Sequence, residues 1–228
     1  MFKQVLKLFF EFIFPKRCFS CNEILAESQD YICVKCTLNL PLTHWKLDND
    51  NKIFNELSKK CKVESATASL YYYDDNVAKN LIHQLKYKSQ QDLGFFFSDL
   101  MFPVLNEYHK LCQITGIVYI PLHPKKKKIR GYNQLEVLAN DLAKKLDIPV
   151  FSQALKTVKY QRSQTSKSQK SRLERRKGVY EMNERLVSGR YLLIDDVFTS
   201  GATIMHCVKE LQKNENVVVC VATVAYTI

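Results

Sequence analysis

The sequence predicts an α/β protein in which a parallel sheet follows a short four-cysteine segment. Strand-like and helix-like stretches alternate from about residue 66 to the end of the chain. Two C-x-x-C pairs precede them in a segment too short to build a core of its own. With 228 residues and 46% hydrophobic content, the chain can bury one good-sized core and a small appendage.

The apolar pattern marks the elements of the expected sheet. Continuous apolar runs at 190–194 and 217–225 are typical of strands buried on both faces, and a helix is expected between them over 202–212, capped by Thr199 or Ser200. This β-α-β order implies a parallel sheet covered on both faces. Further strands are expected at 68–73 and 116–120, and further helices at 76–87 and 133–146.

Composition divides the chain into four parts. We expect an amphipathic N-terminal helix over 1–17, a four-Cys segment over 18–45, a connector over 46–65 and the sheet domain over 66–228.

The N-terminal segment has an apolar face but is too short to span a bilayer. Its apolar residues recur at helical spacing: Phe2, Val5, Leu6, Phe9 and Ile13. This face suits either peripheral contact with the inner membrane or docking onto the protein or a partner. Glu11 interrupts the apolar run and no small-residue cleavage site follows, so we expect no export signal and a cytoplasmic protein.

The paired cysteines indicate a structural metal site. Cys18 and Cys21 form the first pair, Cys33 and Cys36 the second, and the eleven residues between the pairs allow a hairpin to gather four sulfurs. Four soft thiolates suit tetrahedral Zn²⁺ and leave no position for a catalytic water, so we expect a structural zinc ribbon. Disulfides within each pair are the alternative, which a reducing cytoplasm disfavours. The other cysteines have no partner at ligand spacing: Cys61, Cys112, Cys207 and Cys220.

A phosphate-binding stretch follows the apolar strand at 190–194. Ligands of open parallel sheets bind beyond the carboxyl ends of the strands. The residues there are Asp195, Asp196, Val197, Phe198, Thr199, Ser200, Gly201, Ala202 and Thr203. Glycine lets the backbone approach an anion, and the first N–H groups of the following helix are unsatisfied, so the stretch suits a phosphate monoester.

The two acids suit a sugar. Carboxylates accept hydrogen bonds from the vicinal hydroxyls of a ribose, and the sugar ring would separate these hydroxyls from the phosphate. An apolar strand that ends in a helix-capping acid is the alternative interpretation. No G-x-x-x-x-G-K-[ST] sequence occurs, which excludes a Walker-type ATPase.

The stretch YLLIDDVFTSGAT resembles the phosphoribosyl-pyrophosphate motif of type I phosphoribosyltransferases. The resemblance implies a type I phosphoribosyltransferase-like fold that binds 5-phosphoribosyl-1-pyrophosphate together with Mg²⁺. Asp195 and Asp196 would hold the ribose hydroxyls, and residues 199–203 the 5′-phosphate.

Further motifs resemble the ComF competence family over most of the chain. They are the four-Cys segment, Leu85-Lys86-Tyr87, Pro121-Leu122-His123-Pro124, Arg130-Gly131-Tyr132-Asn133-Gln134 and the stretch 161–176. The family is associated with natural transformation, so the resemblance implies handling of single-stranded DNA and partner proteins such as DNA-uptake factors or a helicase. Two departures are Asn22, where the family usually has glycine, and the heavy lysine run at 125–128.

Positive charge is concentrated in two stretches. Residues 156–177 include nine Lys or Arg and one Glu, and residues 125–130 include five more Lys or Arg. The net positive charge of these two stretches together exceeds the net +11 of the whole chain. Such clustering indicates a polyanionic partner, with solvated loops as the alternative. The stretch 156–177 has few apolar anchors, so we expect a long mobile loop.

The resemblance also assigns roles to these cations. The loop that closes over pyrophosphate would be 162–176, and a second pyrophosphate contact would lie around Arg130. Cations and Mg²⁺ stabilise the charge of departing pyrophosphate, and the same cations could follow a DNA backbone. The candidates for contact with pyrophosphate or DNA are Arg130, Arg162, Lys170 and Arg172, with Tyr87, Tyr132 and Tyr160 as residues that could stack on bases.

Three functions fit these features. We favour a competence protein that handles single-stranded DNA and binds 5-phosphoribosyl-1-pyrophosphate and zinc. The second is an active phosphoribosyltransferase acting on a nucleobase or amine, with Arg130, Asp195 and Asp196 as candidate catalytic residues. The third is an adaptor whose zinc segment and N-terminal helix dock partner proteins or the membrane.

Overall fold

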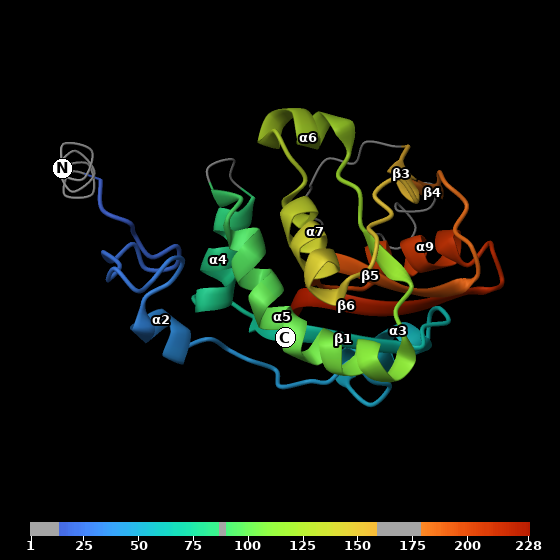
Figure 1. Ribbon diagram of the computed structural model, residues 1–228, viewed down its shortest axis with the longest axis horizontal. Coiled ribbons are helices and arrows are strands. Elements are labelled where there is room, and N and C mark those ends of the chain that lie inside the picture. The colour runs from blue at the N-terminus through green and yellow to red at the C-terminus, as the bar shows by residue number, and fades with distance from the viewer. Residues whose placement is uncertain (1–13, 87–89, 159–178) are drawn as a thin grey trace.

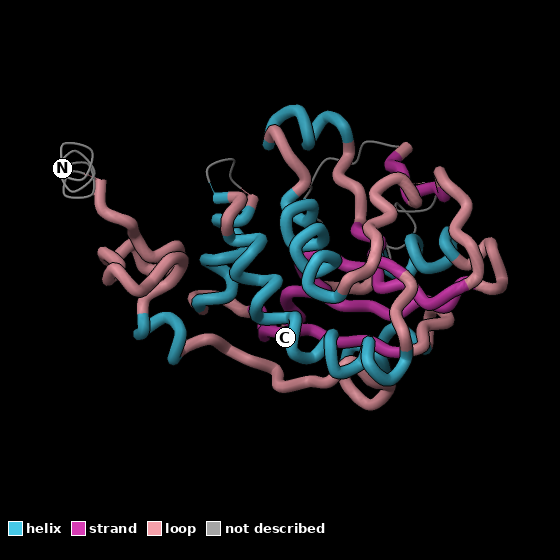
Figure 2. The backbone as a smooth tube through the Cα atoms, viewed as in Figure 1, coloured by secondary structure: helices cyan, strands magenta, loops and turns pink. Residues whose placement is uncertain are grey.

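The protein is built on a four-stranded parallel sheet. A computed structural model describes residues 14–86, 90–158 and 179–228 (Figures 1 and 2). The strand order is β1-β6-β5-β2, with every neighbouring pair parallel. The strands are β1 (Ser65–Tyr72), β2 (Gly116–Tyr119), β5 (Gly189–Phe198) and β6 (Val217–Thr227). The parallel α/β sheet expected from the sequence is confirmed.

The described residues form seven helices, and a short antiparallel pair, β3 (Leu155–Thr157) with β4 (Tyr180–Met182), lies beside the sheet. The helices are α2 (Val34–Leu38), α3 (Lys52–Ser58), α4 (Val77–Leu85), α5 (Leu93–Cys112), α6 (Pro124–Arg130), α7 (Gln134–Leu146) and α9 (Ala202–Leu211). The four-Cys segment lies at one end of the molecule, and α6 stands above the carboxyl edge of the sheet (Figure 1).

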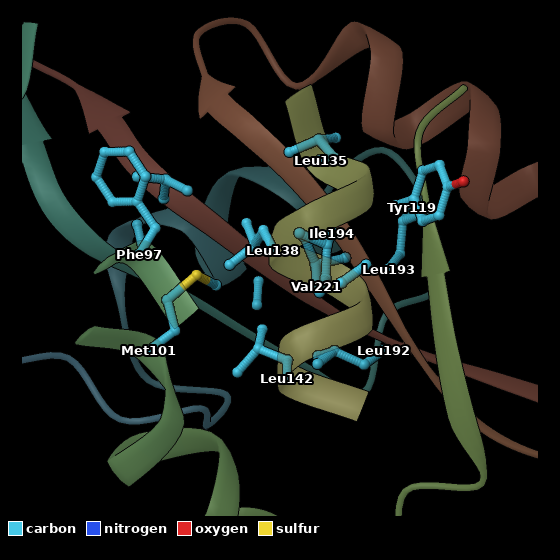
Figure 3. Close-up of a cluster of buried hydrophobic side chains, with 14 of the residues drawn as sticks. Phe97, Met101, Tyr119, Leu135, Leu138, Leu142, Leu192, Leu193, Ile194 and Val221 are labelled. Atoms are coloured by element: carbon cyan, nitrogen blue, oxygen red, sulfur yellow. The ribbon is translucent and has the colours of Figure 1, made fainter. Parts of the chain in front are cut away.

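The core lies between the central strands and the pair α5 and α7. Leucines of α7 pack over β5 and β6, beside an aromatic ring and a methionine of α5 (Figure 3). Continuous apolar sequence in β5 and β6 follows from burial of both faces. The labelled core residues with at most 1% exposure are Phe97, Met101, Leu135, Leu138, Leu142, Leu192, Leu193, Ile194 and Val221.

The strand register places the functional stretch at one edge of the sheet. Tyr119 of β2 lies opposite Ile194 of β5, and Asp195 lies opposite Thr223 of β6. Because parallel strands end at the same edge, the residue after β2, Ile120, comes beside the acidic end of β5.

Two details of the strand-to-helix turn differ from the sequence expectation. Strand β5 continues through both acids to Phe198, because its ladder with β6 extends that far. The expected cap of α9 at Thr199 or Ser200 is wrong: the N-cap is Gly201, with φ of 68° and no side-chain hydrogen bond. A Cβ at Gly201 would approach the Phe198 ring to 2.9 Å, so this left-handed turn requires glycine.

The longest helix, α5, was not expected from the sequence. Its sequence LGFFFSDLMFPVLNEYHKLC has no clean polar face and contains Pro103, which usually disfavours a helix interior. The sequence pattern alone does not predict this helix, which is explained by its packing against α7 in the structure.

Some expectations fall outside the described residues. These are the first thirteen residues of the expected helix at 1–17, and the stretch 159–178, which holds most of the expected basic loop. The start of that loop is instead strand, since Lys156 and Thr157 belong to β3. No helix in the described ranges is long and apolar enough to cross a membrane.

Candidate functional site

A cavity of about 310 Å³ opens at the carboxyl edge of the sheet. Most of the residues that the sequence predicted for the phosphate and ribose site line it: Asp195, Asp196, Val197, Phe198, Thr199, Gly201, Ala202 and Thr203. Arg130, Lys86 and Lys126 line it as well. The fold therefore brings acids, a helix N-terminus and three cations to one cavity.

Ser200 is the exception among the predicted residues, because it is not part of the cavity lining. It is 7% exposed, and within the described ranges its hydroxyl has no hydrogen-bond partner. Its carbonyl accepts a hydrogen bond from Lys60 Nζ at 3.2 Å. A Cβ at the next residue, Gly201, would lie 3.3 Å from Leu57 of α3. The connector thus supports the phosphate-suited turn from behind.

The start of α9 presents unsatisfied backbone donors to the cavity. The amide of Met205 donates to the Gly201 carbonyl at 2.8 Å. The amides of Ala202, Thr203 and Ile204 precede this first helical hydrogen bond. These three residues line the cavity, where the helix dipole also favours an anion.

The two acids are held in fixed orientations by neighbouring groups. The amide of Asp196 donates to Asp195 Oδ1 at 2.9 Å, and the amide of Val197 donates to Asp196 Oδ1 at 2.8 Å. On its other oxygen, Asp196 accepts from Gln134 Nε2 at 3.1 Å and lies 3.8 Å from Lys86 Nζ. Groups from α7 and from the end of α4 therefore orient Asp196.

The five residues 130–134 join α6 to α7 and tie the cavity together. Arg130 Nη1 donates to Gln134 Oε1 at 2.9 Å, and Gly131 ends α6 with φ of 84°. Asn133 Nδ2 donates to the Ile120 carbonyl after β2 at 3.1 Å, while its Oδ1 accepts from the Leu135 amide at 3.1 Å and caps α7.

Tyr132 is a buried anchor rather than a residue that could stack on bases. Its side chain is 7% exposed, and its hydroxyl donates to the Leu85 carbonyl at the end of α4. Burial raises the pKa of its phenol. The expectation that its ring could stack on bases is wrong, because packing covers the ring. The other two tyrosines considered for stacking, Tyr87 and Tyr160, lie outside the described residues.

Sequence reasoning gave no individual role to several residues of the site. Lys86 and Gln134 belong to motifs noted only by resemblance, Lys126 belongs to the lysine run, and Tyr180 comes from β4. An asparagine before an apolar helix is a known capping signal, which would have found Asn133. Three of the expected anion contacts, Arg162, Lys170 and Arg172, lie outside the described residues.

The four paired cysteines form one cluster. The Sγ atoms of Cys18, Cys21, Cys33 and Cys36 lie within 4.8 Å of one another, and the Sγ atoms of Cys21 and Cys33 are 3.6 Å apart. Tetrahedral coordination with metal–sulfur bonds of about 2.3 Å places sulfurs about 3.8 Å apart. The cluster could therefore hold a metal ion, and all four cysteines are free of disulfides.

The environment of the cluster favours a thiolate at Cys18. Burial opposes ionisation there, but backbone hydrogen bonds from Cys21, Cys33 and Ser20 outweigh it and lower the pKa of Cys18 to about 7. Burial instead raises the pKa of the Cys36 thiol. A bound cation would favour the thiolate at every position, since thiolates are the metal ligands.

The unusual Asn22 sits in a left-handed turn. Its φ is 64°, and its amide donates to the Cys18 carbonyl at 2.9 Å, which closes the turn between the first two cysteines. Glycine is the residue with the least strain here, and asparagine is among the few others that tolerate this conformation. Asparagine in place of glycine therefore leaves the turn intact.

Sequence relatives of this chain are competence and DNA-utilization proteins. Competence protein F of Haemophilus influenzae is 29% identical over 58% of this chain and 61% of that protein. DNA utilization protein YhgH of Escherichia coli is 30% identical over 59% and 60%. Competence protein ComFC of Bacillus subtilis is 23% identical over 83% and 75%. The chain thus spans about 60% of the length of the first two relatives. No family model matches.

Among solved structures, adenine phosphoribosyltransferase of Leishmania tarentolae aligns with this chain at a TM-score of 0.36 and 12% sequence identity. The alignment covers 79% of this chain and 89% of the other. This likeness is weak, and no conclusion rests on it.

The fold and the site define an α/β protein with an anion-suited cavity at the carboxyl edge of its parallel sheet and a four-Cys cluster near its N-terminus. The named homologues support placing the chain in the ComF competence family, as the sequence motifs indicated.

The junction between α6 and α7 yields a stability prediction. Asn133→Ala removes the cap of α7 and leaves the Ile120 carbonyl without its donor, so we expect a loss of about 2–3 kcal/mol in the free energy of unfolding. Urea denaturation followed by circular dichroism measures it. The control Asn55→Ala, on the exposed side of α3, should not lower stability. Equal midpoints for Asn133→Ala and wild type would contradict the assignment.

Proposed function

We propose that this chain is a competence protein that handles single-stranded DNA during natural transformation and binds 5-phosphoribosyl-1-pyrophosphate in the cavity at the carboxyl edge of the sheet. The observation that carries the proposal is the set of groups that line this one cavity. They are a helix N-terminus, an acid pair and three cations. The names of the relatives support the competence role.

Each part of the ligand has a chemical match in the cavity. The 5′-phosphate would accept from the backbone donors at the start of α9 and from the hydroxyls of Thr199 and Thr203. The ribose hydroxyls would donate to Asp195 and Asp196. The pyrophosphate would face Lys86, Lys126 and Arg130, with Mg²⁺ supplying charge neutralisation when bound.

The proposal predicts that the acid pair is needed for binding. The double variant Asp195→Asn, Asp196→Asn should bind 5-phosphoribosyl-1-pyrophosphate with Mg²⁺ at least about tenfold more weakly, because two charge-assisted hydrogen bonds to ribose are lost. Isothermal titration calorimetry measures the affinity.

The chain offers a matched control for this experiment. Asp74 and Asp75 are a second adjacent acid pair that follows a strand, β1, but both are exposed and neither lines the cavity. Asp74→Asn, Asp75→Asn should bind as wild type does. Equal binding by the Asp195, Asp196 variant and wild type would refute the ribose site.

Catalysed phosphoribosyl transfer is the alternative function. The same cations that bind pyrophosphate would stabilise it as a leaving group. Release of pyrophosphate that depends on a nucleobase or an amine would favour this alternative, and binding without release across a broad acceptor panel would favour a ligand-binding role.

We propose that DNA binds in part along the outer side of α6. Lys125, Lys127 and Lys128 of this helix are exposed, whereas Lys126 and Arg130 are partly buried and line the cavity. One helix would thus offer cations to a small anion on one side and to a phosphate backbone on the other.

The salt dependence of binding tests this surface. The logarithm of the affinity for single-stranded DNA should fall with the logarithm of salt concentration, with a slope of about −0.7 per phosphate contacted. Changing Lys125, Lys127 and Lys128 to alanine should reduce that slope by about 2, as measured by fluorescence anisotropy. The control variant changes the exposed residues Lys52, Lys59 and Lys62 to alanine, so it loses the same charge, and it should keep the slope. Undetectable binding by wild type at low salt would sink the DNA proposal.

We propose that the four-Cys cluster binds Zn²⁺ as a structural ion. Four thiolates at these separations fit its preferred geometry, and the short segment has little core of its own.

Wild type should contain about one zinc per chain. Cys36→Ser should lose most of it and become sensitive to proteolysis within residues 14–45, as shown by elemental analysis and limited proteolysis. Cys112→Ser, outside the cluster, should keep the metal; equal zinc content in the two variants would argue against the site.

Contact with DNA-uptake or helicase partner proteins, and peripheral contact with the inner membrane from the cytoplasmic side, are further parts of the proposal. Val34 and Leu38 of α2 are 60% and 80% exposed and offer an apolar surface beside the cysteine cluster. The name of one relative, DNA utilization protein YhgH, supports a role connected with DNA.

A further inference from the structure

Gln134 is a buried amide between a cation and an acid of the cavity. Its Oε1 accepts from Arg130 Nη1 at 2.9 Å, and its Nε2 donates to Asp196 Oδ2 at 3.1 Å. The residue is only 7% exposed, although it lines the cavity. We propose that Gln134 is a positioning residue that couples the pyrophosphate side of the site, at Arg130, to the ribose side, at Asp196. The inference rests on the function proposed above.

The chemistry of this position calls for a carboxamide. The group between the two must accept a hydrogen bond from a guanidinium, which only donates, and donate one to a carboxylate, which only accepts. A glutamine amide does both at once. The reverse orientation of the amide would set its NH₂ against the guanidinium and its oxygen against the carboxylate, so the neighbours fix the orientation seen.

Backbone anchoring makes this bridge rigid. Gln134 is the first residue of α7, directly after Asn133, whose side chain binds both the end of β2 and the start of α7. Asp196 is held on its other oxygen by the Val197 amide. The Gln134 side-chain amide therefore cannot turn away from Asp196 without also losing its bond to Arg130. The Asp196 carboxylate cannot turn away from Gln134 without also losing its bond to the Val197 amide.

The bridge makes the two halves of the ligand site interdependent. Hydrogen bonds in a chain polarise one another, so donation by Arg130 to the amide oxygen strengthens donation by the amide nitrogen to Asp196. A glutamine that served Asp196 alone would affect only ribose binding. One that bridges both ends should affect ribose and pyrophosphate binding alike.

Gln134→Met removes both hydrogen bonds at nearly constant volume. We expect it to weaken binding of ribose 5-phosphate and of inorganic pyrophosphate with Mg²⁺ by about fivefold each, and of 5-phosphoribosyl-1-pyrophosphate by about tenfold or more. The control Gln153→Met changes an exposed glutamine outside the cavity and should leave all three affinities unchanged. Urea midpoints establish that each variant is folded.

Gln134→Glu keeps the shape of the side chain and adds a readout that a purely structural role would not move. The titratable groups that line the cavity around the new carboxyl are Asp195 and Asp196 of β5, Lys86 after α4, Lys126 and Arg130 of α6, and Tyr180 of β4. Above neutral pH the new carboxyl repels Asp196. As the pH falls the two adjacent carboxylates take up one shared proton, because they cannot both stay ionised easily even beside Arg130 and Lys86, and one carboxyl then donates to the other. The ribose 5-phosphate affinity of Gln134→Glu, relative to wild type, should recover severalfold between pH 8 and pH 5.5, whereas that of Gln134→Met should not.

The outcomes separate this inference from the function on which it rests. If wild type binds 5-phosphoribosyl-1-pyrophosphate and Gln134→Met binds all three ligands within twofold of it, the coupling is refuted and the proposed function stands. Loss of ribose 5-phosphate binding alone also refutes the coupling, as does a pH-independent ratio for Gln134→Glu. Failure of wild type to bind any of the three ligands removes the proposed function and the inference together.

Discussion

Strand β5 is hydrogen-bonded along both edges, to β6 and to β2, and this pairing determines where the groups of the cavity lie. The ladders leave the two acids at its end no freedom to slide, since a shift by one residue would carry the Asp195 carboxylate into the fully buried position of Ile194. The far end is anchored as well: Arg190 Nη2 lies 2.8 Å from Glu64 Oε1 ahead of β1. The acids therefore sit on a strand that is held along both edges, as a preorganised ligand site requires.

The junction from Arg130 to Gln134 contacts five elements with five consecutive residues. It ends α6, caps α7, binds the carbonyls after β2 and at the end of α4, and reaches the acid at the end of β5. A polar loop that crossed this region without such contacts would leave buried groups unpaired, at about 1–3 kcal/mol each. The run of polar residues is thus explained by backbone and side-chain groups that meet here.

The sequence predicted those parts of the structure that depend on local pattern. Continuous apolar runs identified β5 and β6, the cysteine spacing identified the cluster, and the acid–hydroxyl–glycine run identified eight of the eighteen residues that line the cavity. Long-range contacts were missed, since nothing local shows that Gln134 reaches Asp196 across 62 residues. The same holds for α5, whose apolar residues follow no single face and whose helix depends on packing. The cap of α9 was missed because the left-handed turn at Gly201 depends on the crowding of Phe198 and Leu57 around it.

The connector supports the phosphate-suited turn, so it cannot be separated from the sheet domain without loss of contacts at the cavity. Lys60 holds the Ser200 carbonyl, Leu57 packs behind Gly201, and Glu56 accepts a hydrogen bond from Tyr226 at the end of β6. The segment between the cysteine cluster and the sheet is therefore part of the ligand-binding unit. An exchange of the N-terminal part between relatives would therefore have to end ahead of α3, which begins at Lys52, to keep these contacts.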